Sequence, residues 1–133
     1  MRCLLCNNYE EDHSHLFFQC DMSKQLWSMI QMKCSTQIPK LNWNSLVSWL
    51  SSSWRSKNLR TLSWKLSLAS TVYHIWMERN FRFHNRSSNS VTRIWEMILE
   101  MVRMKMAALK GVRDTIENRE TALMWNLPSK IFS

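Results

Sequence analysis

Apolar residues recur in steps of three and four along most of the second half of the chain. Between residues 59 and 83 they form one continuous row: Leu59, Leu62, Leu66, Ala69, Tyr73 and Trp76. Between Ser90 and about Glu117 they form a second row, interrupted only by its polar member Lys105: Ile94, Ile98, Met101, Lys105, Ala108 and Val112. Because this spacing places side chains on one face of an α-helix, both rows predict long amphipathic helices. The short polar segment "HNRSSNS" between them predicts an antiparallel hairpin.

Three shorter segments complete the predicted elements. The segment "DMSKQLWSMIQM" predicts a short helix capped by Ser23, with Leu26, Met29 and Ile30 on one side. Residues 43–54 predict another helix, with an apolar stripe formed by Trp43, Val47, Leu50 and Trp54. The segment "SSSWRSK" is expected to break the chain before the first long helix. The C-terminal "ALMWNLPSKIF" is expected to lie extended over the hairpin.

The composition favours the same class of fold. Apolar residues make up 45% of the 133 residues, enough for one core of modest size. The chain has one glycine and two prolines, so the turn residues that β-hairpins require are scarce. We therefore predict a mainly α-helical protein, with a small N-terminal Cys/His module, a short helix and a long antiparallel helical hairpin.

The net charge of +8 is carried by the second half of the chain. Residues 1–54 hold four basic and four acidic side chains, whereas residues 55–119 hold 13 Lys and Arg against 5 Asp and Glu. The remaining residues add one charge of each sign. A neutral N-terminal part joined to a basic C-terminal part favours an anionic partner such as RNA or DNA.

The N-terminal segment gives expectations about location. It is rich in cysteine and soon acidic, without the apolar core of a secretory signal. No apolar run in the sequence approaches the ~20 residues that a membrane span requires. We therefore expect an intracellular protein, in the nucleus or the cytoplasm and not secreted. In such a reducing compartment, closely spaced cysteines bind metal more often than they form disulfides.

Three of the four cysteines stand within the first 20 residues, in the segment "CLLCNNYEEDHSHLFFQC". The pattern Cys3-x2-Cys6-x8-His15-x4-Cys20 offers three thiolates and one imidazole, a ligand set used by structural zinc sites. Spacing alone leaves two ligand choices open: His13 could bind the metal in place of His15, and Cys34 could bind it in place of Cys20. A further alternative is that these are free cysteines in a small helical protein.

The sequence offers no arrangement that suits catalysis. Its ten acidic residues are scattered rather than paired, and Gly111 alone cannot form a glycine-rich phosphate loop. No turn motif exposes a nucleophilic serine. Four protein ligands would also leave a zinc ion without an open position for water. We therefore expect a structural zinc ion and no enzymatic activity.

The segment "CLLCNNYEEDHSHLFFQCDMSKQLW" resembles the core of the zinc-binding domain found at the C-terminus of plant reverse transcriptases from LINE-type (non-LTR) retrotransposons. The pattern of that family joins Cys-x2-Cys, an acidic stretch, His-Leu-Phe-Phe-x-Cys and a Trp. It corresponds here to Cys3, Cys6, residues 15–20 and Trp27. The segments "IWMERN" at residues 75–80 and "MWNLPSKIF" near the end are also similar to parts of those polyproteins. The resemblance therefore covers nearly the whole chain.

This resemblance implies a ligand set and a division of the chain. It makes His15 and Cys20 ligands, so that Zn²⁺ would be held by Cys3, Cys6, His15 and Cys20. Zinc-binding domains of the family begin farther upstream, so residues 1–33 are expected to be a truncated zinc-binding module and residues 34–133 a basic helical tail. The polymerase motif Tyr-x-Asp-Asp does not occur in the sequence. The implied function is a non-catalytic module of a retrotransposon reverse-transcriptase tail that binds RNA or DNA.

The segment "ERNFRFHNR" is the clearest candidate for contact with nucleic acid. Arginines recur there beside two phenylalanines, and arginine binds phosphate while aromatic rings stack on unpaired bases. The residues expected to contact phosphate are Arg79, Arg82, Arg86, Arg93 and Lys105. The alternative is an ordinary helix surface, in which Phe83 belongs to the core, the arginines are solvated and Glu78 pairs with Arg82.

Eight tryptophans and ten methionines suggest a second function class. A domain of this size cannot easily bury all of them, and open apolar surface favours association with a partner or with a second copy. The alternative function is therefore a protein-interaction factor, a transposon remnant acting through an exposed Trp/Met-rich helical face.

Overall fold

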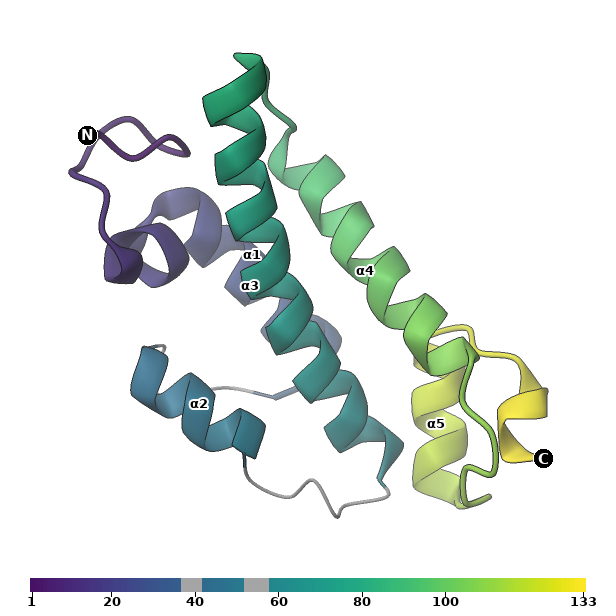
Figure 1. The fold of residues 1–133 in the computed structure, drawn as a ribbon. Coiled ribbons are helices and arrows are strands. Elements are labelled where there is room, and N and C mark those ends of the chain that lie inside the picture. The colour runs from purple at the N-terminus through teal and green to yellow at the C-terminus, as the bar shows by residue number, and fades with distance from the viewer. Residues whose placement is uncertain (37–41, 52–57) are drawn as a thin grey trace.

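The computed structural model describes residues 1–36, 42–51 and 58–133. Within these ranges the backbone forms helices and loops, and its extended pairing is limited to an isolated bridge between Arg2 and Glu10. The elements follow in the order η1 (His15–Gln19), α1 (Asp21–Lys33), α2 (Trp43–Ser51), α3 (Leu59–Asn85), α4 (Val91–Ala107), α5 (Ile116–Met124) and η2 (Ser129–Phe132) (Figure 1). The predicted fold class, mainly helical with a Cys/His cluster ahead of the helices, is confirmed.

The antiparallel pair α3 and α4 forms the framework of the fold (Figure 1). Each helix starts with a side-chain cap: Asn58 accepts a hydrogen bond from the amide of Arg60, and Ser90 accepts one from the amide of Arg93. Helix α3 ends at Asn85, and its C-cap Arg86 adopts a left-handed conformation with φ of 50°. Helix α1 packs against both helices of the pair, and α5 packs against α3. The N- and C-termini lie at opposite ends of the hairpin (Figure 1).

The second long helix is shorter than the sequence pattern predicts. It ends at Ala107 rather than near Glu117, and the chain then turns at Gly111, whose φ is +66°. The Gly111 amide donates to the carbonyl of Ser133 at 2.9 Å, so this stretch pairs with the C-terminus instead of continuing the helix. A separate helix, α5, starts after the capping residue Thr115. The expected continuation of this helix beyond Ala107 was therefore wrong: the helical hydrogen bonding stops at the cap Ala108, and the left-handed Gly111 then directs the chain toward the C-terminus.

The C-terminal segment also differs from the expected extended conformation. Residues 122–124 form the last turn of α5, and Ser129–Phe132 forms a 3₁₀ turn. Ile131 is fully buried and anchors this turn in the core.

The buried face of α3 follows the predicted apolar row only in part: Leu59 is buried, and Leu62 and Leu66 pack against the core as expected. Tyr73 is 49% exposed and Trp76 is 43% exposed. The buried face joins Leu68 and Ile75 to four small hydroxyl residues, Ser63, Ser67, Ser70 and Thr71. Three of these hydroxyls donate to main-chain carbonyls one turn earlier at 2.6–2.7 Å: those of Ser63, Ser67 and Thr71. Because their polar atoms are satisfied within the helix, these residues can be buried against α1 and α4.

Helix α4 follows the predicted pattern over its first half. Ile94 and Ile98 are buried as expected. Beyond them the buried positions are Val102 and Met106, one residue later than the predicted Met101 and Lys105. Lys105 is therefore exposed on the helix surface rather than interrupting the core.

The N-terminal segment packs into the same core as the hairpin. Trp27 on α1 is fully buried, and its indole nitrogen donates to the carbonyl of Phe17 at 2.6 Å. The Phe18 ring stacks on Trp27 with centroids 5.8 Å apart. Helix α1 starts at Asp21, not at the expected cap Ser23, whose hydroxyl instead donates to the carbonyl of Leu16 at 2.5 Å. The boundary between residues 33 and 34 stays a prediction, and the buried core is continuous across it.

Helix α2 packs Trp43 and Leu50 against the core as predicted, but it also buries Leu46 and leaves Val47 58% exposed, so its inner face follows the predicted stripe only in part. The expected stripe residue Trp54 and most of the expected break at residues 51–57 lie outside the described residues. Across the described ranges, no helix has both the length and the hydrophobicity needed to cross a membrane.

Candidate metal centre

The first half of the candidate site is a loop that folds back on itself. The amide of Cys3 donates to the carbonyl of Tyr9 at 2.7 Å, and the amide of Asn7 donates to the carbonyl of Cys3 at 2.8 Å. Asn7 adopts a left-handed conformation with φ of 58°, which asparagine tolerates better than most residues. This turn brings the side chains of Cys3 and Cys6 to the same side of the loop.

The second half of the site is the π-helical turn η1. Asp12 accepts a hydrogen bond from the amide of His15 at 2.7 Å and so starts the helical backbone. The amide of Cys20 then donates to the carbonyl of His15 at 2.7 Å, across five residues. In an α-helix, side chains five residues apart diverge by about 140° around the axis. The wider π turn reduces this divergence, so His15 and Cys20 face the same point.

The structure brings four side chains together: Cys3, Cys6, His15 and Cys20. Their ligand atoms all lie within 4.8 Å of one another. The Sγ atoms of Cys3 and Cys20 are 3.9 Å apart, and the Sγ atom of Cys6 lies 3.3 Å from Nε2 of His15. Cys3, His15 and Cys20 are buried, and Cys6 is partly buried.

This spacing fits a closed, four-coordinate metal site. A tetrahedral ion with metal–sulfur distances of about 2.3 Å and a metal–nitrogen distance of about 2.0–2.1 Å separates its ligand atoms by roughly 3.5–3.8 Å. The two distances above bracket that range, and the cysteines form no disulfide. Three sulfurs and one imidazole also form a donor set that suits a thiophilic metal ion. The four residues could therefore hold one metal ion with no open coordination position.

The thiols of the cluster differ in acidity. Burial opposes ionisation of Cys6, but hydrogen bonds from the backbone amide of Asn8 and from His15 lower its pKa to about 7. Burial raises the pKa of Cys20 to about 12, and the electrostatic interaction with the neighbouring thiols adds to this effect. A divalent cation at the centre would reverse the balance at Cys20, because a coordinating thiol is deprotonated.

The two alternative ligands lie apart from the cluster. His13 is exposed, and its ring contacts the edge of Phe17 with centroids 6.5 Å apart. Cys34, at the end of α1, is buried with its Sγ atom 3.7 Å from the hydroxyl of Ser67. Burial raises the pKa of the Cys34 thiol, so it remains a neutral core residue.

Two of the residues expected to contact phosphate are paired with carboxylates. Nε of Arg79 lies 2.9 Å from Oε1 of Glu11, and Nε of Arg82 lies 2.7 Å from Oε2 of Glu78. Their side chains are only 17% and 15% exposed. The pairing of Glu78 with Arg82 confirms that part of the alternative interpretation, whereas its assignment of Phe83 to the core is wrong, since Phe83 is 53% exposed. Phosphate contact by Arg79 and Arg82 stays a prediction.

The other three expected phosphate contacts lie on the surface. Arg86 and Lys105 are exposed and make no hydrogen bond or ion pair with any described residue. Arg93 is exposed and lies 3.4 Å from a carboxylate oxygen of Glu96, an exposed pair of small energetic value. Their charges are available to solvent and to a partner.

Sequence reasoning did not identify the residues that support the site. Asp12, three residues before His15, is a capping signal that the sequence could have given. Glu11 and Asn89 could not have been identified in this way. Glu11 bonds to Arg79, which is 68 positions away in the sequence. Asn89 bonds to Glu78, which is 11 positions away, across the turn between two helices.

Residues 1–27 match the family described as zinc-binding in reverse transcriptase. No curated protein and no solved structure matches the chain. The match includes all four clustered ligand residues and Trp27. The N-terminal segment of this protein is therefore similar to the zinc-binding domain of reverse transcriptases.

Proposed function

We propose that the chain carries a structural zinc ion and binds nucleic acid, either RNA or DNA, without catalysing a reaction. The observation that supports the zinc ion most strongly is the convergence of Cys3, Cys6, His15 and Cys20 within 4.8 Å. Three thiolates and one imidazole favour zinc among the common divalent ions. Because all four positions are taken by protein, the ion stabilises the fold rather than activating water.

Nucleic-acid binding is supported by the charge of the helical part. The excess of basic residues lies in residues 55–119, and the exposed residues Arg86, Arg93 and Lys105 belong to this part. We assign phosphate contact first to these three residues, since Arg79 and Arg82 already pair with carboxylates. The resemblance to plant LINE-type reverse transcriptases supports an origin in a retrotransposon and a role in the nucleus or the cytoplasm.

A salt titration tests this proposal. Binding of zinc-loaded protein to fluorescent single-stranded RNA and DNA is measured between about 50 and 200 mM salt. Three phosphate contacts predict a slope of log affinity against log salt of about −2, since each contact on a single strand contributes about −0.7. The variant Arg86→Met/Lys105→Met should lower the magnitude of the slope by about 1.4.

The matched control is Lys24→Met/Lys130→Met, which also removes two exposed positive charges but lies outside the basic segment. It should leave the slope close to that of the unmodified protein. Absence of binding at low salt, or equal effects of both double variants, would contradict the proposed interface.

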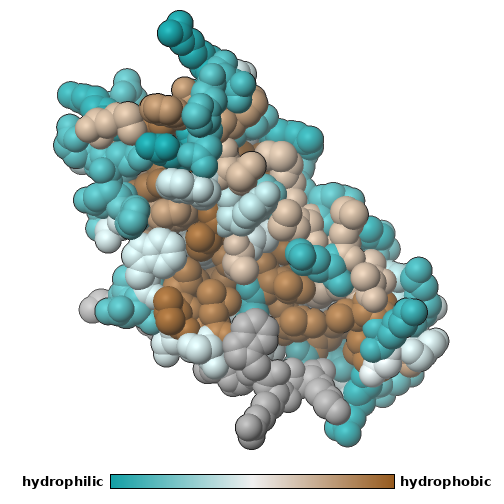
Figure 2. Space-filling view, in the orientation of Figure 1, coloured by the Kyte–Doolittle hydropathy of each residue, from teal (hydrophilic) through white to brown (hydrophobic). Residues whose placement is uncertain are grey.

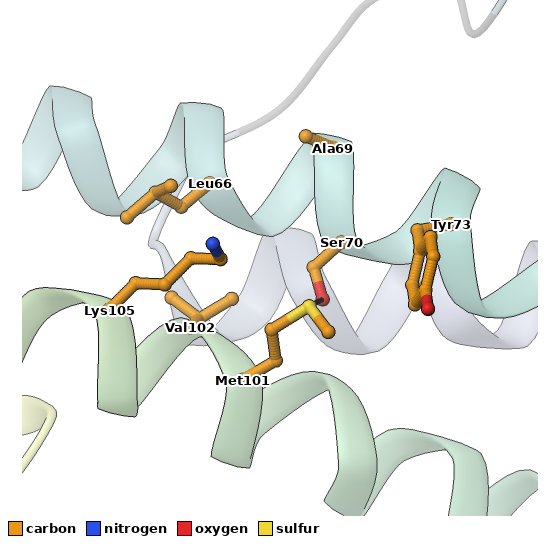
Figure 3. A pocket seen from close by; sticks show the side chains of 7 residues that line it. All are labelled: Leu66, Ala69, Ser70, Tyr73, Met101, Val102 and Lys105. Atoms are coloured by element: carbon orange, nitrogen blue, oxygen red, sulfur yellow. Dashed lines mark hydrogen bonds between the residues drawn. The ribbon is translucent and has the colours of Figure 1, made fainter.

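A second candidate function is supported by an apolar groove between α3 and α4. The groove encloses about 300 Å³, and its lining side chains come from both helices: Leu66, Ala69, Ser70, Tyr73, Met101, Val102 and Lys105 (Figure 3). Apolar side chains gather on this face, where the two helices lie side by side (Figure 2). Tyr73, Trp76, Met77 and Met104 are 43–59% exposed. Such a surface favours a protein partner through hydrophobic contact.

The two candidates are distinguished by one substitution. Tyr73→Ser reduces the apolar lining of the groove and changes no charge. If protein association is the function, this variant should lose a nuclease-resistant complex, while an Arg86→Met/Arg93→Met variant, which leaves the groove lining unchanged, keeps it. The opposite result would support nucleic acid as the partner.

A further inference from the structure

The turn between Cys3 and Cys6 is held from outside by one arginine of α3. Nη1 of Arg82 donates to the carbonyl oxygens of Leu4 and Leu5, each at 3.1 Å. Leu4 and Leu5 are the two residues between the first pair of candidate ligands. Arg82 thus fixes the peptide groups that determine where both sulfurs point.

Arg82 is itself held by a buried carboxylate. Nε of Arg82 lies 2.7 Å from Oε2 of Glu78, whose side chain is only 2% exposed. Glu78 also accepts hydrogen bonds from the backbone amide of Asn89 at 2.9 Å and from its side-chain amide at 2.8 Å. Nη2 of Arg82 donates to the carbonyl of Asn89 at 3.2 Å. Because both charges have several partners, the pair can be buried without leaving an unsatisfied ion.

A second ion pair holds the same turn. Glu11 accepts a hydrogen bond from the amide of Leu4 at 3.3 Å, and its other oxygen lies 2.9 Å from Nε of Arg79. Both the amide and the carbonyl of Leu4 are therefore bound to a network centred on α3. The residues of "IWMERN" and the following turn connect the ligand loop to the helical hairpin.

The position of this network points to a role at the metal. Residues that orient ligands without touching the ion commonly set metal affinity, and their loss costs about 10–100-fold. We infer that the buried Glu78–Arg82 pair is the outer shell of the metal centre: it positions the Cys3–Cys6 turn for the ion and couples that turn to Asn89, at the corner between α3 and α4. Arg82 is a positioning residue and does not touch the metal. This inference rests on the proposed zinc site.

The inference is tested by the metal affinity of full-length variants. Arg82→Lys keeps the positive charge, but one ammonium group cannot donate hydrogen bonds to Glu78, to Asn89 and to both loop carbonyls at the same time. Arg82→Met/Glu78→Gln removes both charges, so that no buried ion is left without a partner. Arg93→Met, which removes an exposed arginine near the start of α4, is the matched control. Zinc affinity is measured by competition with a chromophoric chelator, cobalt spectra report the ligand geometry, and circular dichroism reports the helix content.

We expect Arg82→Lys and the double variant to lose zinc affinity by about 10–100-fold, with unchanged helix content and altered cobalt bands, while Arg93→Met stays within about twofold of the unmodified protein. Removing zinc from the unmodified protein should also accelerate hydrogen exchange at the amide of Asn89. Unchanged affinity in both Arg82 variants would overturn the inference. Affinity lost only in proportion to helix content would also overturn it, because Arg82 would then stabilise the fold alone. An unmodified protein that binds no zinc would instead overturn the proposed function.

Discussion

Nε2 of His15 lies 3.3 Å from Sγ of Cys6, although the two residues are nine positions apart in the sequence. Cys6 belongs to the folded-back N-terminal loop, whereas His15 belongs to the π turn η1. The two atoms meet only when both elements are formed and packed. Metal binding and folding of this segment should therefore be linked, as they are in other small metal-binding modules.

Replacing Cys6 by Ser is expected to reduce the metal content from one ion per chain to none and to lower the unfolding temperature. A serine hydroxyl does not ionise near neutral pH and cannot replace a thiolate ligand. Elemental analysis measures the content, and thermal unfolding followed by circular dichroism measures the stability. His15→Ala should give the same result, whereas His13→Ala and Cys34→Ala should keep the ion. Equal losses in His13→Ala and His15→Ala would show that the ligand assignment is wrong.

In the metal-free protein, Cys6 and Cys20 should differ in their rates of thiol alkylation. The pKa of Cys6 is lowered to about 7, so its thiolate fraction and its alkylation rate should rise as the pH increases through about 7. The pKa of Cys20 is raised to about 12, so Cys20 should stay protonated and slow throughout the range from pH 6 to about pH 9. Mass spectrometry of pulse-labelled protein gives both rates. One equivalent of zinc should protect both residues, and equal rates without metal would contradict these environments.

Trp27→Phe should lower the free energy of unfolding by about 2–4 kcal/mol. The substitution leaves a cavity in the core and leaves the carbonyl of Phe17 without its indole donor. Trp76→Phe, at a position that is 43% exposed, is the matched control and should have a smaller effect. Urea unfolding in the presence of zinc measures both values. A smaller loss for Trp27→Phe than for Trp76→Phe would not fit this packing.

Gly111→Ala should lower the free energy of unfolding by about 1 kcal/mol, because alanine is disfavoured at a φ of +66°. A Cβ atom at this position meets no other atom within 4 Å, so the cost is conformational rather than steric. Gly111→Asn should cost less, since asparagine tolerates the left-handed region. Urea unfolding of the two variants provides the measurement. If the alanine variant is as stable as the unmodified protein, the fold does not require a left-handed backbone at position 111.

The sequence pattern predicted the helices better than their buried faces. The polar segment before Ser90 marked the start of the second long helix, whereas the cap of the first, Asn58, was found only in the structure. The inner face of α3 escaped prediction because it is built partly from serine and threonine, whose hydroxyls bond to their own helix. A pattern of apolar residues does not reveal a buried face that is made partly of serine and threonine. The apolar spacing continues through Ala108 and Val112, so the periodic pattern did not reveal that α4 ends at Ala107.

The candidate metal centre was partly accessible from the sequence. Cysteine spacing suggested a metal site, and the resemblance to reverse transcriptases favoured His15 over His13 and Cys20 over Cys34. The support of the site by Arg82 and Glu78 depends on contacts between residues more than 70 positions apart, such as Arg82 with Leu4. No local pattern encodes such a contact.

X-ray absorption spectroscopy of protein loaded with one equivalent of zinc tests the metal centre most directly. Binding by Cys3, Cys6, His15 and Cys20 predicts three sulfur atoms at about 2.3 Å and one nitrogen atom at about 2.0–2.1 Å from the ion. The His15→Ala variant should lose the imidazole signal, and the His13→Ala variant should retain it. Coordination by oxygen and nitrogen atoms alone, or by fewer than three sulfur atoms, would contradict the assignment of these four residues.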